Sequence, residues 1–197
     1  MEEEKSYKIE NVSIRTFDPE QDTASAYRCY RDGFSHVNWP IFEHASINLT
    51  LDMLRSYHEM ASDALVAEVS GEVNAFLLGS VITGLRDFHV SPLFSVVRVT
   101  LGVLSNSYQM NRLAYKHLLQ TLYGYLPFSY LHPFSWTYAE VMLFTSTTDY
   151  RNQGIGRKLM DAFVSSVKER GIRLVYVGTD TAISIRGMVL LELGSSI

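Results

Sequence analysis

The sequence has little cysteine, no long apolar run and no leader-like start. Cys29 is the only cysteine among 197 residues, so an internal disulfide is impossible and a reducing compartment is favoured. Apolar runs such as 75–78 and 101–104 fall far short of the ~20 residues that a membrane span needs. The first five residues, Met-Glu-Glu-Glu-Lys, lack the charge and the apolar core of a signal peptide. We therefore expect a soluble, cytoplasmic protein with no membrane association.

Basic side chains and metal-binding patterns are also scarce. Seventeen Lys and Arg stand against 21 Asp and Glu, which gives a formal net charge of −4. Nucleic-acid binding needs a clustered basic surface, so nucleic acid is not an expected partner. A cationic or amine substrate suits such a protein better. The six histidines show no spacing of the His-Glu-x-x-His kind, and no metal site is expected.

The length and a hydrophobic content of 47% predict one globular domain over residues 1–197. Alternating apolar residues indicate strands, and apolar residues at i, i+4 indicate helices. A Ser70-Gly71 turn between two apolar runs predicts a hairpin. Cys29 falls on the apolar side of the first helix and is expected in the core. The strands are expected at 8–16, 64–69, 73–78, 138–145 and 172–178, and the helices at 22–34, 51–60, 109–122 and 154–170.

The segment Arg151–Gly156 lies between the strand expected at 138–145 and the following helix. A helix N-terminus has unpaired backbone N–H groups and a partial positive charge. Gly154 and Gly156 remove the side chains that would keep a phosphate from the backbone. Arg151, Arg157 and Lys158 add formal charge. The segment therefore predicts a pyrophosphate site, and the alternative is a tight strand-to-helix turn without a ligand.

Residues 138–160, YAEVMLFTSTTDYRNQGIGRKLM, closely resemble motif A of the GNAT superfamily of acyl-CoA-dependent N-acetyltransferases. The hairpin at 65–78 is similar to the family's second and third strands, and residues 14–34 to its first strand and helix. The resemblance implies an α/β fold, in which a central mixed sheet is flanked by helices. Residues 85–136 would then be a helical, aromatic-rich insertion between the third and fourth strands. That insertion would form a substrate lid, a homodimer surface or only a satellite core.

The resemblance also implies roles for individual residues. Acetyl-CoA would be the co-substrate, and a primary amine of a small molecule or a peptide would be the acceptor. Glu140 would be the general base; the alternative is an exposed strand glutamate that pairs with a cross-strand cation. The implied CoA contacts are the backbone of Phe144, Thr145 and Ser146 for pantetheine, and Arg151, Asn152, Gln153, Gly154, Ile155, Gly156 and Arg157 for the pyrophosphate.

One part of the family pattern is missing near the C-terminus. Leu190 occupies the position where the family commonly has a tyrosine that protonates the departing CoA thiolate. The sequence stops at Ile197, soon after this position, which leaves no residues for the family's last two strands, so a short or incomplete C-terminal end is expected. These departures keep a second reading open, namely a catalytically degenerate GNAT-like domain that binds CoA or acts as a sensor.

Overall fold

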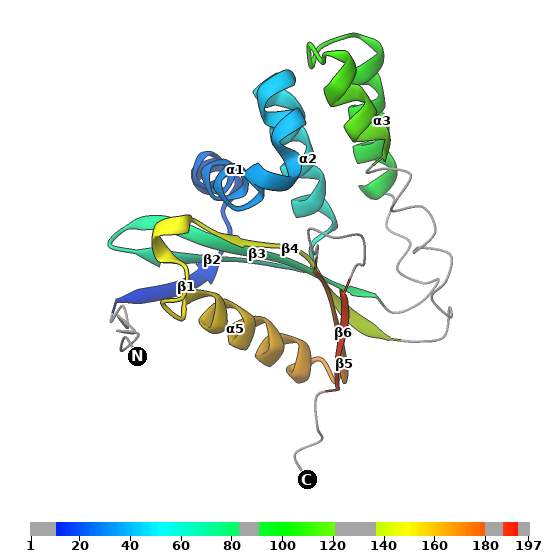
Figure 1. The fold of residues 1–197 in the computed structure, drawn as a ribbon. Helices are drawn as coiled ribbons and strands as arrows, with labels where there is room; N and C mark the ends of the chain where they lie inside the picture. Colours follow the sequence, from blue (N-terminus) through cyan, green and yellow to red (C-terminus); the bar gives the residue numbers. More distant parts are fainter. Residues whose placement is uncertain (1–10, 83–90, 121–136, 180–186, 193–197) are drawn as a thin grey trace.

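The computed structural model describes residues 11–82, 91–120, 137–179 and 187–192, and these form one mixed sheet with helices on both faces (Figure 1). The sheet order follows the chain, and only the β4–β5 pair is parallel. The expected α/β fold with a central mixed sheet is therefore confirmed. The six strands are β1 (Val12–Thr16), β2 (Asp63–Val69), β3 (Glu72–Ile82), β4 (Tyr138–Ser146), β5 (Leu174–Thr179) and β6 (Gly187–Glu192).

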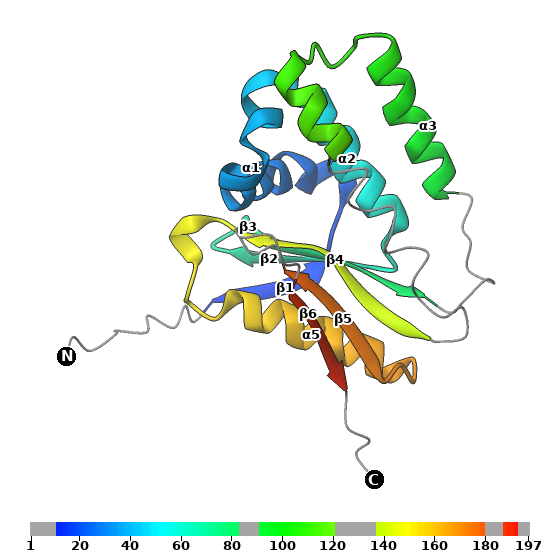
Figure 2. The same ribbon diagram turned by 45° about the vertical axis from the view of Figure 1, so that its right-hand side comes forward.

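The helices divide between the two faces of the sheet. Helices α1 (Pro19–His44), α2 (Ile47–Met60) and α3 (Ser91–Leu104) lie on one face, and α5 (Ile155–Glu169) covers the other (Figures 1 and 2). Residues 112–120 form one more helix beside α3. No helix in the described ranges is long and apolar enough to cross a membrane.

Helix α5 confirms the predicted strand–helix–strand unit. Its apolar residues recur every fourth position and are fully buried against the sheet, at Ile155, Leu159, Phe163 and Val167. The helix ends at Gly171, whose φ of 76° favours glycine, and the Gly171 N–H bonds the carbonyl of Lys168. The hairpin is confirmed too, and both of its turn residues have positive φ.

Helix α1 is longer than predicted. We expected it to end at residue 34, but it continues through Pro40 to His44. A proline inside a helix costs a backbone hydrogen bond, which is why the sequence predicts an end before it. Packing outweighs this cost, because Ile41 is buried in a cluster with Leu49 and Tyr108. Helix α2 likewise begins four residues before the predicted residue 51.

The region between β3 and β4 contains one predicted helix and one that was missed. The helix expected at 109–122 is described over 112–120, and Gln109 lies outside it with a φ of 48°. Helix α3 was not predicted, because its β-branched residues favour strands and the helix depends on packing against α2. The aromatic run at 123–130 lies outside the described residues.

The C-terminal region adds one strand to the described sheet. Strand β6 pairs antiparallel with β5, so the described sheet continues past residue 178. Leu190, placed by resemblance at the tyrosine position, lies within β6 opposite Tyr176.

Candidate functional site

A cavity of about 370 Å³ opens at the N-terminus of α5, where the end of β4 and the middle of α1 come together. It brings together all the residues predicted to contact CoA except Gln153 and Arg157, which do not line it. Tyr150 and two residues of α1 complete the wall. The lining residues are Gly33, Phe34, Phe144, Thr145, Ser146, Tyr150, Arg151, Asn152, Gly154, Ile155 and Gly156.

The turn before α5 is held in a conformation that points backbone N–H groups into this cavity. Gly154 is the N-cap residue with a φ of 83°, which only glycine adopts readily. The first amide bonded within the helix is that of Lys158, which donates to the Gly154 carbonyl at 3.1 Å. The three preceding amides, of residues 155–157, therefore have no partner within the helix. Such a helix N-terminus is a ready anion site.

Glycine 156 lets the first turn of α5 lie directly on β4. A Cβ atom at this position would come within 2.8 Å of the Phe144 ring. Any side chain here would therefore have to displace Phe144, which lines the same cavity. The two glycines of the motif have different tasks, since Gly154 supplies a backbone conformation and Gly156 supplies space.

Helix α1 contributes part of the cavity that sequence reasoning missed. A Cβ at Gly33 would lie 1.8 Å from Oγ1 of Thr145, so glycine alone permits this approach of α1 to β4. The neighbouring Asp32 accepts hydrogen bonds from the backbone N–H and from Oγ1 of Thr148. These contacts, the backbone one above all, hold the pKa of Asp32 below its usual range, and Arg151 adds to the effect. A glycine inside a helical pattern was the one signal available.

Strand β4 separates from β5 after a short stretch of pairing. The two strands pair only at residues 139–141 with residues 175–177, whereas β4 continues to Ser146. On its other side, β4 keeps pairing with β3, with a bulge at Met142 where the register shifts. Beyond Val141, no described residue of β5 pairs with β4. One flank of the backbone at Phe144–Ser146 therefore faces an opening in the sheet.

Glu140 lies at the paired end of β4 on the face opposite α5. Its neighbours Ala139 and Val141 belong to the core under α5, and side chains alternate along a strand, so Glu140 faces the α1–α2–α3 side. Burial raises the pKa of its carboxyl group. Its register partners are Ser80 and Tyr176, and neither is a cation. Among the described residues, Glu140 therefore has no cationic register partner across the strands.

Two tyrosines surround this carboxyl group. Tyr138 and Tyr176 lie on the same face as Glu140, two positions along β4 and across on β5 respectively. Burial, and then the charges of Glu140 and Tyr176, raise the pKa of Tyr138 to about 12. The phenol of Tyr138, on the same face as this carboxyl group, therefore keeps its proton near neutral pH. Glu140 does not line the cavity at α5; Phe144 lies four residues further along, roughly 13 Å at the rise of a strand.

No group of three or more His, Cys, Asp or Glu side chains in the described ranges is placed to hold a metal ion. Cys29, predicted to be core, is fully buried in α1, and burial raises the pKa of its thiol to about 11. His132, a further candidate base, lies outside the described residues.

Comparison with protein families finds a match to the acetyltransferase (GNAT) family over residues 113–186, which include β4, α5 and β5. No curated protein matches the chain. Several solved structures share its fold. A GNAT family acetyltransferase from Brucella melitensis, solved in complex with acetyl-CoA, is 16% identical with a TM-score of 0.51, and the alignment covers 95% of this chain and 91% of that one.

Two further solved structures share the fold of this chain at similarly low sequence identity. Arylalkylamine N-acetyltransferase 2 from Aedes aegypti is 16% identical with a TM-score of 0.55, over 88% of this chain and 78% of that one. A glucosamine N-acetyltransferase region of a fungal multi-domain β-N-acetylglucosaminidase is 13% identical with a TM-score of 0.52, over 90% of this chain and 14% of that one. At these identities the structures show the fold, and the family match lies on the segment that forms the cavity. Residues 113–186 thus match the acetyltransferase (GNAT) family, and the chain shares the fold of solved GNAT acetyltransferases.

Proposed function

We propose that this chain, as a single domain over residues 1–197, transfers an acetyl group from acetyl-CoA to a primary amine of a small molecule or peptide. The observation that supports this most strongly is the coincidence of two features along β4. The turn before α5 lies at one end of the strand, and the half-buried carboxyl group of Glu140 lies toward the other, with the opening between β4 and β5 in between. A long co-substrate with a charged end and a reactive end fits that arrangement.

The turn would hold the pyrophosphate of CoA. The unpaired amides of residues 155–157 supply directed donors, and Arg151 supplies a formal charge beside them. Gly154 and Gly156 keep the approach clear of side chains. Along the opening, the free backbone flank of Phe144–Ser146 offers amide and carbonyl groups to the pantetheine arm, much as an edge strand accepts an added strand.

Glu140 would act as the general base. An amine with a pKa near ~10 is mostly protonated at neutral pH and must lose a proton before it can attack a thioester. Burial raises the pKa of Glu140, which makes its carboxylate a stronger proton acceptor than an exposed glutamate. The amine nitrogen then bonds to the thioester carbon as the carbon–sulfur bond breaks. A thiol with a pKa near ~8.5 is an adequate leaving group without an assigned acid.

A CoA-binding or sensor domain is the second candidate, and the observation that favours it is Leu190. This residue lies in β6 opposite Tyr176, where it cannot protonate a thiolate. The acceptor is a separate question, because the structures that share the fold are named for different acceptors, an arylalkylamine and glucosamine. The fold therefore does not select among amines.

The test is CoA binding by calorimetry, with a matched pair of variants. Gly154→Asp and Gly171→Asp both place a side chain at a positive-φ glycine with no atom within 4 Å, at opposite ends of α5. We expect Gly154→Asp to abolish CoA binding and Gly171→Asp to retain it, since the two share the backbone strain but only the first opposes the pyrophosphate. Equal affinities in two folded variants would contradict the site.

A second measurement separates the enzyme from the sensor. Thiol release from acetyl-CoA, followed over a panel of amines, reports turnover directly. We expect release that depends on the amine. CoA binding without release for any amine of the panel would favour the sensor.

A further inference from the structure

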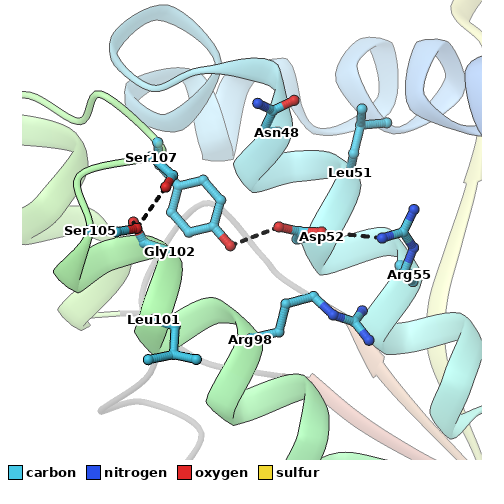
Figure 3. A pocket seen from close by; sticks show the side chains of 10 residues that line it. Asn48, Leu51, Asp52, Arg55, Arg98, Leu101, Gly102, Ser105 and Ser107 are labelled. Atoms are coloured by element: carbon cyan, nitrogen blue, oxygen red, sulfur yellow. Dashed lines mark hydrogen bonds and ion pairs between the residues drawn. The ribbon is translucent and has the colours of Figure 1, made fainter.

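A second cavity, of about 540 Å³, lies between α2 and α3 on the sheet face opposite α5 (Figure 3). It shares no residue with the cavity at the turn before α5, and no motif in the sequence indicated it. Its walls carry two guanidinium groups, one carboxylate, a tyrosine and several small polar groups. The lining residues are Asn48, Leu51, Asp52, Arg55, Arg98, Leu101, Gly102, Ser105, Ser107 and Tyr108.

The carboxylate of this cavity, that of Asp52, already interacts with groups of the protein. The hydroxyl of Tyr108 donates to Oδ2 of Asp52 at 2.8 Å, and Nη1 of Arg55 lies 3.7 Å from Oδ1. Burial, and then the bond to Asp52, raise the pKa of Tyr108 to about 12, so this hydroxyl keeps its proton at neutral pH. Gly102 makes room for the tyrosine, since a Cβ there would lie 2.3 Å from its ring.

The two arginines, in contrast, have donors left over. A guanidinium has five N–H groups. The side chain of Arg55 is 63% exposed, and among the described residues its one ion pair is with Asp52, at 3.7 Å. Arg98 donates from Nη2 to Glu59 at 2.7 Å, while its Nη1 is buried and has no hydrogen-bond partner among the described residues. A covered guanidinium N–H without a partner is costly, which points to an acceptor group that the described residues do not supply.

The geometry brings these donors to one end of the cavity. Arg98 reaches from α3 across to α2, so that its head and that of Arg55 lie at the same end, away from Ser105 and Ser107 (Figure 3). Both guanidiniums come from helices, which fix their separation better than loops do. Paired guanidiniums of this kind bind a carboxylate through parallel hydrogen bonds.

This end of the cavity lies toward the part of the sheet that contains Glu140. Helix α2 ends at Met60, and Ser62 then bonds to β3 through its N–H to Gly79 and through its hydroxyl to the Val81 N–H. Gly79 and Val81 flank Ser80, which is the register partner of Glu140. Glu59, which pairs with Arg98, precedes Ser62 by less than one helical turn. The Arg98 end of the cavity is therefore close in the chain to the strand segment that pairs with Glu140.

We propose that the α2–α3 cavity binds the carboxylate of the acceptor, so that the acceptor is an amine carrying a carboxylate at its other end. This inference rests on the proposed acetyl transfer, because it assigns the second anchor of the same substrate. Arg55 and Arg98 hold the carboxylate, and the amine extends along the sheet face to Glu140. Asp52 does not repel the ligand strongly, because Tyr108 and Arg55 already engage it.

The experiment compares ω-amino acids of increasing length with their amides, which have the same amine and no carboxylate. Binding to the full chain in the presence of CoA is measured by calorimetry, which needs no turnover. We expect the best acid to bind about tenfold or more tightly than its amide, as one charge-assisted contact allows. Arg55→Gln and Arg98→Gln should each reduce this preference. Arg112→Gln, which removes an exposed charge from the same region outside the cavity, should not.

Several outcomes would overturn the inference. Equal binding of acids and amides would do so, and so would a preference that survives both cavity substitutions. Tighter binding of an aminophosphonate than of any carboxylate would contradict the assigned group. Arg55 is exposed, so its variant keeps the test valid if Arg98→Gln fails to fold. An acid preference that depends on the arginines in a chain that releases no thiol would support the anion site and contradict the proposed transfer.

Discussion

The contact of α5 with the sheet and the contact of α2 with α3 are built on different principles. Under α5, a stripe of fully buried apolar side chains packs against the strands, and Phe163 lies so close that a Cβ at Gly79 would be 2.2 Å from its ring. Between α2 and α3, a polar network of Tyr108, Asp52 and two arginines bridges the helices, and Leu104 remains 76% exposed. The difference indicates where substitutions are tolerated. In the closely packed core under α5, any change in side-chain volume lowers stability, whereas single polar contacts between α2 and α3 can be replaced.

The largest expected effect is at Glu140, on the sheet face that α1, α2 and α3 cover. Glu140→Gln should lower turnover by about 10²–10⁴-fold, the usual range for a positioned base, and leave CoA affinity unchanged. Because burial raises the pKa of Glu140, the acid limb of the wild-type pH–rate profile should lie at higher pH than for an exposed glutamate, and the variant should lack it. Glu72→Gln, at an exposed position on β3, is the control. A fall of less than about threefold would remove Glu140 from the mechanism.

The next effect should appear on CoA affinity and arise from α1. Asp32→Asn weakens the hydrogen bonds that hold Thr148, so the loop before the turn becomes looser. We expect CoA to bind roughly threefold to tenfold more weakly, as loss of one or two hydrogen bonds allows. Asp161→Asn, at an exposed position on α5, is the matched control. If both variants bind CoA like the wild type, Asp32 does not position the site.

A smaller effect should appear in stability. The folded state raises the pKa of Glu140, so the ionised carboxylate lowers stability near neutral pH relative to the protonated form. That cost is absent below the pKa of the unfolded chain and grows as pH rises through the folded pKa. Thermal unfolding of Glu140→Gln should therefore occur at a higher temperature than the wild type at pH 8, with the gain vanishing near pH 4. A variant that is less stable at pH 8 would show that the carboxylate is well solvated.

The smallest effect is expected on the outer surface of α3. Leu104→Lys changes a side chain that is 76% exposed, so stability and CoA affinity should both stay within about 0.5 kcal/mol of the wild type. Urea unfolding and calorimetry would measure the two quantities. A larger loss would mean that another surface covers this leucine, and a change of oligomeric state would identify the surface as that of a second copy.

The elements that could be predicted from the sequence are those that local interactions determine. Helix α5, the hairpin and the glycine turn followed from periodicity and turn chemistry, which depend on neighbours in sequence. The approach of Gly33 to Thr145 could not be predicted, because it joins residues far apart in the chain. The extension of α1 past Pro40 and the existence of α3 depend on tertiary packing that outweighs propensity. The α2–α3 cavity depends on α3 and was invisible for the same reason.

The short ladder between β4 and β5 also bears on how the molecule holds together. Only residues 139–141 and 175–177 join the β5–β6 hairpin to the rest of the sheet, while β3 and β4 pair along nearly their whole length. The packing of α5 supplies much of the remaining attachment, through residues such as Val175 in its core. The β4–β5 ladder is therefore the shortest in the described sheet, and we expect β5 and β6 to open more readily than β3 and β4. The cleft that would admit a co-substrate is thus also the line along which the fold would first come apart.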